Sequence, residues 1–113
     1  MAKTITLNYE QATYTLEFTR RTVSELEGQG FNISEIGDKP VTMVPMLYEG
    51  AFLAHHRMAK NDIIWEIYEQ IPDKEALLKA LAEMYAEPIE ALFDTKEVEG
   101  DEKNAITWKA SWD

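Results

Sequence analysis

The first eighteen residues alternate between apolar and polar positions in two runs. Apolar side chains occupy every second position of each run, at Ile5, Leu7 and Tyr9 and then at Tyr14, Leu16 and Phe18. A period of two with β-branched and aromatic residues is typical of half-buried strands, and the polar residues 10–12 allow the strands to pair antiparallel. The pattern predicts a hairpin with strands at roughly 3–9 and 13–18. Because an isolated two-stranded hairpin is marginal in water, we expect the following helices to cover its apolar face.

The alternation ends at Thr19, after which helical patterns begin. Thr19 is a suitable N-cap for a first helix that ends at residues 28–30, where glycine can adopt the left-handed C-terminal conformation. Residues 32–35 have the form of a capping box and predict a single turn that ends at Gly37.

The largely apolar segment 42–56 predicts the central helix, with Thr42 as its N-cap. Pro45 then falls in the first turn, where its missing N–H costs no hydrogen bond. Gly50 in the interior costs about 1 kcal/mol relative to alanine, which a close approach of another element would explain.

Two more helices are expected in the second half of the chain. Asn61 or Asp62 caps the first of them, and Pro72 ends it. Asp73 caps the second, in which apolar residues recur every three or four positions, at Leu77, Leu81, Tyr85, Ile89 and Leu92. Pro88 is expected to divide this last helix into pieces at 74–86 and 88–94.

These elements predict an α+β fold, in which an N-terminal antiparallel β-hairpin packs on a bundle of about four helices. A length of 113 residues suits one domain, which we place at 1–94. Residues 95–113 are expected to form a flexible, acidic tail that contains tryptophan. Six residues are predicted to be buried in the core: Leu47, Tyr48, Ala51, Leu77, Leu81 and Tyr85.

Charge and composition exclude several classes of protein. The net charge is −10, which disfavours nucleic-acid binding through phosphate neutralisation. Residues 1–60 carry six basic and seven acidic side chains, whereas residues 61–113 carry five and 14, a net charge of −9. The acidic half indicates self-repulsion and a basic partner, or solubility alone. Without cysteine the chain has no disulfide, thiol nucleophile or cysteine-ligated zinc.

No apolar run approaches the roughly 18 residues of a membrane span, and the strand pattern begins so early that no signal peptide is evident. We therefore expect a soluble, intracellular protein with no membrane partner.

The sequence contains only weak candidates for a catalytic or metal-binding site. His55 and His56 are adjacent, and neighbouring helical residues point about 100° apart, so the two rings cannot share a metal as an i, i+4 pair can. A mixed site with Asp62 and Glu66 remains open. There is no phosphate-binding loop, nucleophile elbow or dinucleotide fingerprint. We predict no catalytic residue, no metal ligand, no cofactor and no enzymatic activity.

Aromatic residues are the better candidates for binding a partner. Trp65 and Tyr68 lie at i, i+3 on a predicted helix that is rich in isoleucine, so they either complete the core or expose part of a face to a partner. Trp108 and Trp112 follow the acidic stretch, where exposed tryptophan favours recognition. Alternatively, residues 105–108 form an edge strand on the hairpin.

The order and spacing of three segments resemble a known family. They are ITLNYEQATYTLEFTRRTVSELEGQGFNISEI, MVPMLYEGAFLAHHR and IYEQIPDKEALLKALAEMYAEPIEALF, followed by a short tail with tryptophan. Over nearly its whole length the chain resembles the tail assembly chaperones of long-tailed (siphovirus-type) phages and prophages of Gram-positive bacteria.

This resemblance implies a non-enzymatic role in the host bacterial cytoplasm. Such chaperones are thought to coat the tape-measure protein, keep it soluble while the tail tube polymerises, and be absent from the mature virion. The family often makes a longer, frameshifted product that recruits the tail-tube protein. A homo-oligomer is left open, and no catalytic residue transfers to this chain.

Two other functions compete with this interpretation. An acidic interaction module, such as a DNA mimic that occupies a basic protein site, would bind its partner in a salt-sensitive way. A small metal-dependent enzyme would use His55 or His56 with Asp62 and Glu66, and the purified protein would then contain stoichiometric metal.

Overall fold

The N-terminal hairpin is the only sheet in the part of the chain that this computed structural model describes, residues 3–93 and 109–112. Strand β1 (Ile5–Tyr9) pairs antiparallel with β2 (Ala12–Leu16), and Leu7 lies opposite Tyr14. The turn has two residues, Glu10 (φ 48°) and Gln11 (φ 68°), rather than the expected three. Positive φ at both positions is the backbone of a type I′ turn, whose twist matches that of the strands.

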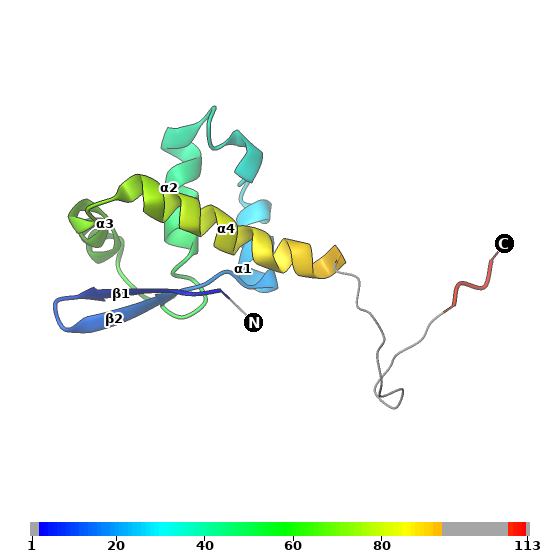
Figure 1. Cartoon of the computed structure of the whole chain (residues 1–113), viewed down its shortest axis with the longest axis horizontal. Coiled ribbons are helices and arrows are strands. Elements are labelled where there is room, and N and C mark those ends of the chain that lie inside the picture. The colour runs from blue at the N-terminus through cyan, green and yellow to red at the C-terminus, as the bar shows by residue number, and fades with distance from the viewer. Residues whose placement is uncertain (1–2, 94–108, 113) are drawn as a thin grey trace.

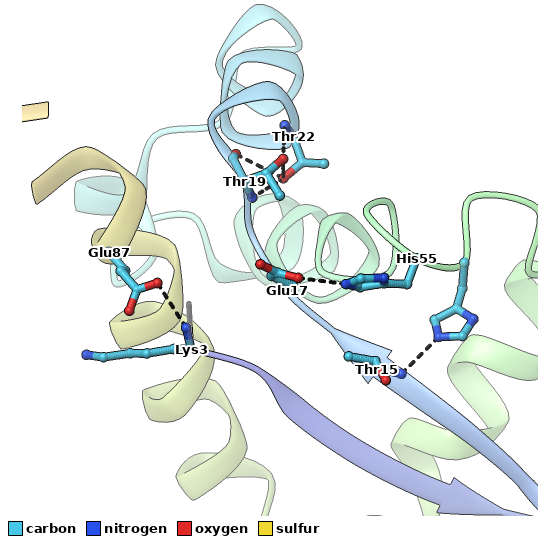
Figure 2. Close-up of polar contacts among 8 residues, drawn as sticks. Lys3, Thr15, Glu17, Thr19, Thr22, His55 and Glu87 are labelled. Atoms are coloured by element: carbon cyan, nitrogen blue, oxygen red, sulfur yellow. Dashed lines mark hydrogen bonds and ion pairs between the residues drawn. The ribbon is translucent and has the colours of Figure 1, made fainter. Parts of the chain in front are cut away.

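Helix α1 (Arg20–Gly28) begins where the alternation of the hairpin ends. Thr19 is its N-cap, as predicted. The hydroxyl of Thr19 accepts from the backbone N–H of Thr22 at 3.2 Å, and the backbone N–H of Thr19 donates to the Thr22 hydroxyl at 2.9 Å (Figure 2). This reciprocal capping box satisfies two N–H groups at the helix start. A single 3₁₀ turn, η1 (Ile33–Glu35), follows with Asn32 as its N-cap, also as predicted.

Helix α2 (Pro40–Gly50) differs from the expected central helix at both ends. It starts at Pro40, because the fixed φ of proline suits the first helical position and its missing N–H would have no partner there. The N-cap is Lys39 rather than Thr42, and Pro45 lies in the interior rather than in the first turn. After Gly50 the chain continues as turns through residue 55, so both histidines lie outside the helix.

Helices α3 (Asn61–Gln70) and α4 (Lys74–Phe93) complete the fold. The N-cap of α3 is Lys60 rather than the expected Asn61 or Asp62. The carboxylate of Asp73 accepts from the backbone N–H of Ala76 at 3.0 Å, as expected of a cap for α4. Pro88 does not divide α4, which is one continuous helix. The buried Pro88 and the contacts of α4 with both α1 and α2 explain why tertiary packing outweighs the local effect of proline.

The core lies between the helices and one face of the hairpin, which runs below α4 in Figure 1. All six residues predicted to be buried are buried, and the α+β architecture of a hairpin with four helices is confirmed. Further core members come from the hairpin side and the helices: Leu16, Phe18, Val23, Leu26, Phe31, Met43, Phe52, Ile64 and Met84.

Two other sequence predictions concern the tail and the membrane. Most of the predicted tail, residues 95–108 and 113, lies outside the described residues, as does residue 94 at the end of the predicted domain. Within the described part, no helix combines the length and the hydrophobicity that a membrane crossing requires.

Candidate functional site

Trp65 and Tyr68 lie side by side in an aromatic cluster centred on the buried ring of Tyr48. Their ring centroids are 5.1 Å and 4.8 Å from that of Tyr48, with interplanar angles of 62° and 58°. Phe52 approaches the other side of Tyr48, with its centroid at 5.3 Å and an angle of 84°. Edge-to-face and tilted geometries of this kind place the positive edge of one ring against the negative face of another.

The polar ends of the cluster are satisfied within the protein. The Trp65 indole N–H donates to a carboxylate oxygen of Glu49 at 2.6 Å, and the Tyr48 hydroxyl donates to the Ile64 carbonyl at 2.5 Å. Burial raises the pKa of Tyr48 above its ordinary value of 10. Trp65 and Tyr68 are both half-buried, so each ring belongs to the core and also reaches the surface. Their role as anchors for a partner stays a prediction.

The two tail tryptophans are described to different extents. Trp108 lies outside the described residues, whereas the side chain of Trp112 is 79% exposed. Among the described residues, the rings that contact Trp65 and Tyr68 do not include Trp112. Trp112 is nevertheless a large apolar side chain in contact with water, which is the property that favours recognition.

The structure reveals a further apolar surface between α1 and the end of α4, which we name the α1–α4 groove. Its volume is about 340 Å³, and its lining consists of Arg20, Val23, Ser24, Glu27, Pro88, Ile89, Leu92 and Phe93. The sequence placed Leu92 on the core stripe of the last helix. That prediction is wrong, because Leu92 is 58% exposed, and Phe93 beside it is 80% exposed. The sequence feature that could have indicated this exposed surface is Phe93, an apolar residue next to the stripe and directly before the acidic stretch.

The start of the described chain contacts α4 at Glu87, the residue directly before the groove-lining Pro88. The backbone N–H of Lys3 donates to a carboxylate oxygen of Glu87 at 2.9 Å (Figure 2). This bond joins the start of the hairpin to α4, and it helps to fix the part of the helix that carries Pro88 and Ile89.

The histidines make separate hydrogen bonds instead of a shared site. His56 Nε2 accepts from the backbone N–H of Thr15 at 2.8 Å on the outer edge of β2, and His55 Nε2 lies 2.6 Å from a carboxylate oxygen of Glu17 (Figure 2). His56 is half-buried, whereas His55 is exposed. Helix α2 ends at Gly50, so neither histidine lies in its last turn, where the negative end of the helix dipole is.

The acidic residues considered with the histidines have other partners or lie apart. A carboxylate oxygen of Glu66 accepts from the Tyr9 hydroxyl at 2.8 Å. This bond is the main reason why the pKa of Tyr9 is raised to about 12. Among residues 3–93 and 109–112, no three histidine or carboxylate side chains come together as a metal site would require.

Arg57, the residue after His56, forms an ion pair with Glu25 that connects two parts of the fold. The guanidinium of Arg57 donates to both carboxylate oxygens of Glu25, at 2.9 Å and 2.8 Å, and so ties the turn after α2 to α1. The same hydrogen bonds lower the pKa of Glu25 and raise that of Arg57. Bidentate geometry gives the pair more orientation than a single contact would.

Comparison with known proteins identifies a family but no function. No curated protein and no solved structure matches this sequence. A family model described as Domain of unknown function (DUF5055) matches residues 1–112, which includes Trp112 as well as the hairpin and all four helices. The chain therefore belongs to the DUF5055 family.

Proposed function

We propose that this protein is a non-enzymatic tail assembly chaperone, which binds an apolar helical segment of a phage tape-measure protein and keeps it soluble. The observation that carries the proposal is the α1–α4 groove, with Leu92 and Phe93 exposed along one wall. Exposed, adjacent apolar side chains beside a groove mark a protein-binding surface more often than scattered ones do. The resemblance to tail assembly chaperones over nearly the whole chain supports the identity of the partner.

The groove suits an amphipathic helix as its ligand. A helix that lays its apolar stripe in a groove presents side chains at i, i+3 and i+4. Burial of apolar surface supplies about 25 cal/mol per Å², from which the cost of association must be subtracted. A groove of this size therefore gives weak binding for each chaperone. Many copies along one long tape-measure chain would compensate through avidity and could still be displaced one at a time.

The net charge supports the same function. A value of −10 keeps proteins that coat a common chain apart from one another and from neighbouring coated chains. The proposal places this complex in the host bacterial cytoplasm, absent from the mature virion. A longer, frameshifted form would contact the tail-tube protein.

Co-expression with fragments of the cognate tape-measure protein tests the proposal. We expect the fragments to become soluble with the wild-type protein and to co-elute with it in size exclusion. Leu92→Glu should abolish this effect, because it places a charge in the groove wall. Val41→Glu is the matched control, since Val41 is exposed in the first turn of α2 and does not line the groove. Fragments that stay equally insoluble with and without the wild-type protein would refute the chaperone function.

The same assay separates the groove from the aromatic surface predicted by the sequence. If Trp65→Ala and Tyr68→Ala abolish solubilisation in folded protein while Leu92→Glu does not, the partner binds at the aromatic cluster instead. Salt-sensitive capture of a basic protein, with no effect on tape-measure fragments, would favour the acidic interaction module.

A further inference from the structure

The two outer edges of the β-hairpin have different surroundings. The edge of β2 is covered by the turns that follow α2. The backbone N–H of Thr15 donates to His56 Nε2 at 2.8 Å (Figure 2). Just beyond the strand, the backbone N–H of Glu17 donates to the Ala51 carbonyl at 3.1 Å. The edge of β2 is therefore closed to a further strand.

The edge of β1 is open. Alternate residues of an antiparallel pair direct their backbone N–H and C=O groups toward the other strand or away from it. Because the Thr15 N–H points outward to His56, Thr15 and its partner Thr6 exchange no hydrogen bonds with each other. Thr6 and Asn8 therefore present their backbone groups at the outer edge of β1. Within residues 3–93 and 109–112, no backbone hydrogen bond from another element reaches either residue.

Strand β1 also lacks the features that protect an exposed edge in other proteins. Such features are charged side chains, proline, bulges and a covering element. The five residues of β1 include no charged residue and no proline. Each of them is paired with one residue of β2, so this fully described strand contains no bulge. An edge of this kind is a template for another strand.

From these features we infer that β1 pairs antiparallel with β1 of a second copy of this chain, which joins two hairpins into one four-stranded sheet. The register centred on Leu7, the middle residue of β1, overlaps the strand with itself over its whole length. In this register Thr6 of each copy pairs with Asn8 of the other, so the outward N–H and C=O groups of both residues are hydrogen bonded.

The apolar side chains of β1 suit a second copy as the partner. Ile5, Leu7 and Tyr9 lie on one face of the strand and are only half-buried. The pairing continues this row into the same row of the second copy and covers part of its exposed surface. Leu7 lies opposite Leu7 of the second copy in a pair without mutual hydrogen bonds, which is the geometry that brings side chains closest.

Charges at the ends of β1 favour the same partner. Lys3 and Glu10 lie just outside the two ends of the strand, and both are exposed. In the register centred on Leu7, Thr4 lies opposite Glu10 of the second copy, so Lys3 of each copy is beside Glu10 of the other. Opposite charges across paired strands are stabilising. The contact therefore brings together two chains whose net charge of −10 otherwise makes them repel.

This inference goes beyond the proposed function and does not depend on it. Strand β1 and the lining of the α1–α4 groove have no residue in common, so pairing at β1 uses a different surface. A dimer would carry two grooves, which would add avidity for a long partner. The oligomeric state is measured without any tape-measure protein, so a failure of either proposal is recognised separately.

Sedimentation equilibrium of the full chain, from micromolar to millimolar concentration, tests the dimer. Thr6→Lys combined with Asn8→Lys places like charges opposite each other in both pairs of the interface. We expect the dissociation constant of the dimer to rise about tenfold, because like charges directly opposite are destabilising. Thr6→Lys combined with Asn8→Glu is the matched control. It changes the same two exposed positions but places opposite charges against each other, so it should retain the dimer.

Amide hydrogen exchange of the wild-type chain gives a second readout that needs no substitution. The amides of Thr6 and Asn8 should become more protected as the protein concentration rises, because the dimer supplies their hydrogen bonds. The amide of Thr13 is the internal control. It faces the outer edge of β2, two residues from Thr15, so its exchange should not depend on concentration. Circular dichroism verifies that both double variants are folded.

Three results would overturn the inference. The first is a monomer at every concentration, with the amides of Thr6 and Asn8 exchanging as fast as that of Thr13. The second is a dimer that both double variants weaken equally, or that neither weakens, which would place the interface elsewhere. The third is protection of Thr6 and Asn8 that is independent of concentration, which would show that the chain covers its own edge, as a strand at residues 105–108 would.

Discussion

Gly50 on α2 and Leu26 on α1 lie so close together that a substitution at Gly50 tests the packing of the two helices directly. A Cβ atom added at Gly50 would lie 2.6 Å from Leu26 Cδ1, 2.9 Å from Cδ2 and 3.2 Å from Cγ. Leu26 is only 2% exposed on α1, so its side chain has little room to move away. The close approach of α1 to α2 therefore depends on the missing side chain at Gly50.

The sign of the Gly50→Ala effect follows from two opposing magnitudes. Alanine at a helical position with an ordinary backbone gains about 0.5–1 kcal/mol over glycine. Forcing a methyl group into a packed core costs about 1–3 kcal/mol. We expect the overpacking to win, so that Gly50→Ala lowers the free energy of unfolding by about 1 kcal/mol.

A double-mutant cycle with Leu26→Ala isolates the contact. Leu26→Ala alone should cost about 2–5 kcal/mol, as buried leucine truncations do. It also removes all three atoms that crowd the new Cβ, so Gly50→Ala should then stabilise the protein by about 0.5–1 kcal/mol. Urea unfolding followed by circular dichroism measures all four proteins, with shifts of the midpoint at constant slope. The same effect of Gly50→Ala in both backgrounds would show that Leu26 does not crowd the added methyl group.

Three further perturbations test the cap and two polar contacts. Thr19→Ala should cost about 1 kcal/mol in urea unfolding, because both bonds of the α1 capping box depend on the Thr19 side chain or the geometry it fixes; an unchanged midpoint would contradict this role. The hydrogen bonds to Arg57 lower the pKa of Glu25 below its ordinary value of 4.5. The ion pair therefore stabilises the folded protein at a pH above 4.5, and this stabilisation is lost as the pH falls through the lower pKa that Glu25 has in the folded state. The melting temperatures of wild type and Glu25→Gln should therefore differ at neutral pH and converge in acid, and a constant difference would argue against the ion pair. The bond to Glu66 raises the pKa of Tyr9 to about 12, so its stabilising effect is complete below pH 10 and disappears as the pH rises to 12. In an absorbance titration, Tyr9→Phe should remove the ionisation near pH 12, and its persistence would exclude this assignment.

The sequence determined the parts of the fold that depend on near neighbours in the chain. Alternation of apolar residues placed the hairpin, and side-chain caps placed the starts of α1, η1 and α4 at Thr19, Asn32 and Asp73. These signals act over two to four residues, so they can be read without knowledge of the rest of the structure. The periodic apolar positions also identified the six core residues that were predicted to be buried.

Prolines show where local reasoning was insufficient. Pro88 was expected to divide the last helix, but α4 packs against both α1 and α2 and continues through it. Pro45 likewise lies inside α2, whose start was set by Pro40 and not by Thr42. The local cost of a proline is about 3 kcal/mol, and burial of the surrounding apolar surface can exceed it.

The candidate site depended on tertiary structure even more strongly. The sequence singled out Trp65 and Tyr68 as aromatic residues on one helix face, and the packing around Tyr48 decided that both rings are half-buried. Leu92 continues the core stripe of α4 in sequence, yet it is exposed and forms a groove with α1. A periodic pattern determines which face of a helix is apolar, whereas burial depends on how far the neighbouring helices extend along that face. That extent is set by contacts between residues distant in the chain, so only the folded structure could decide it.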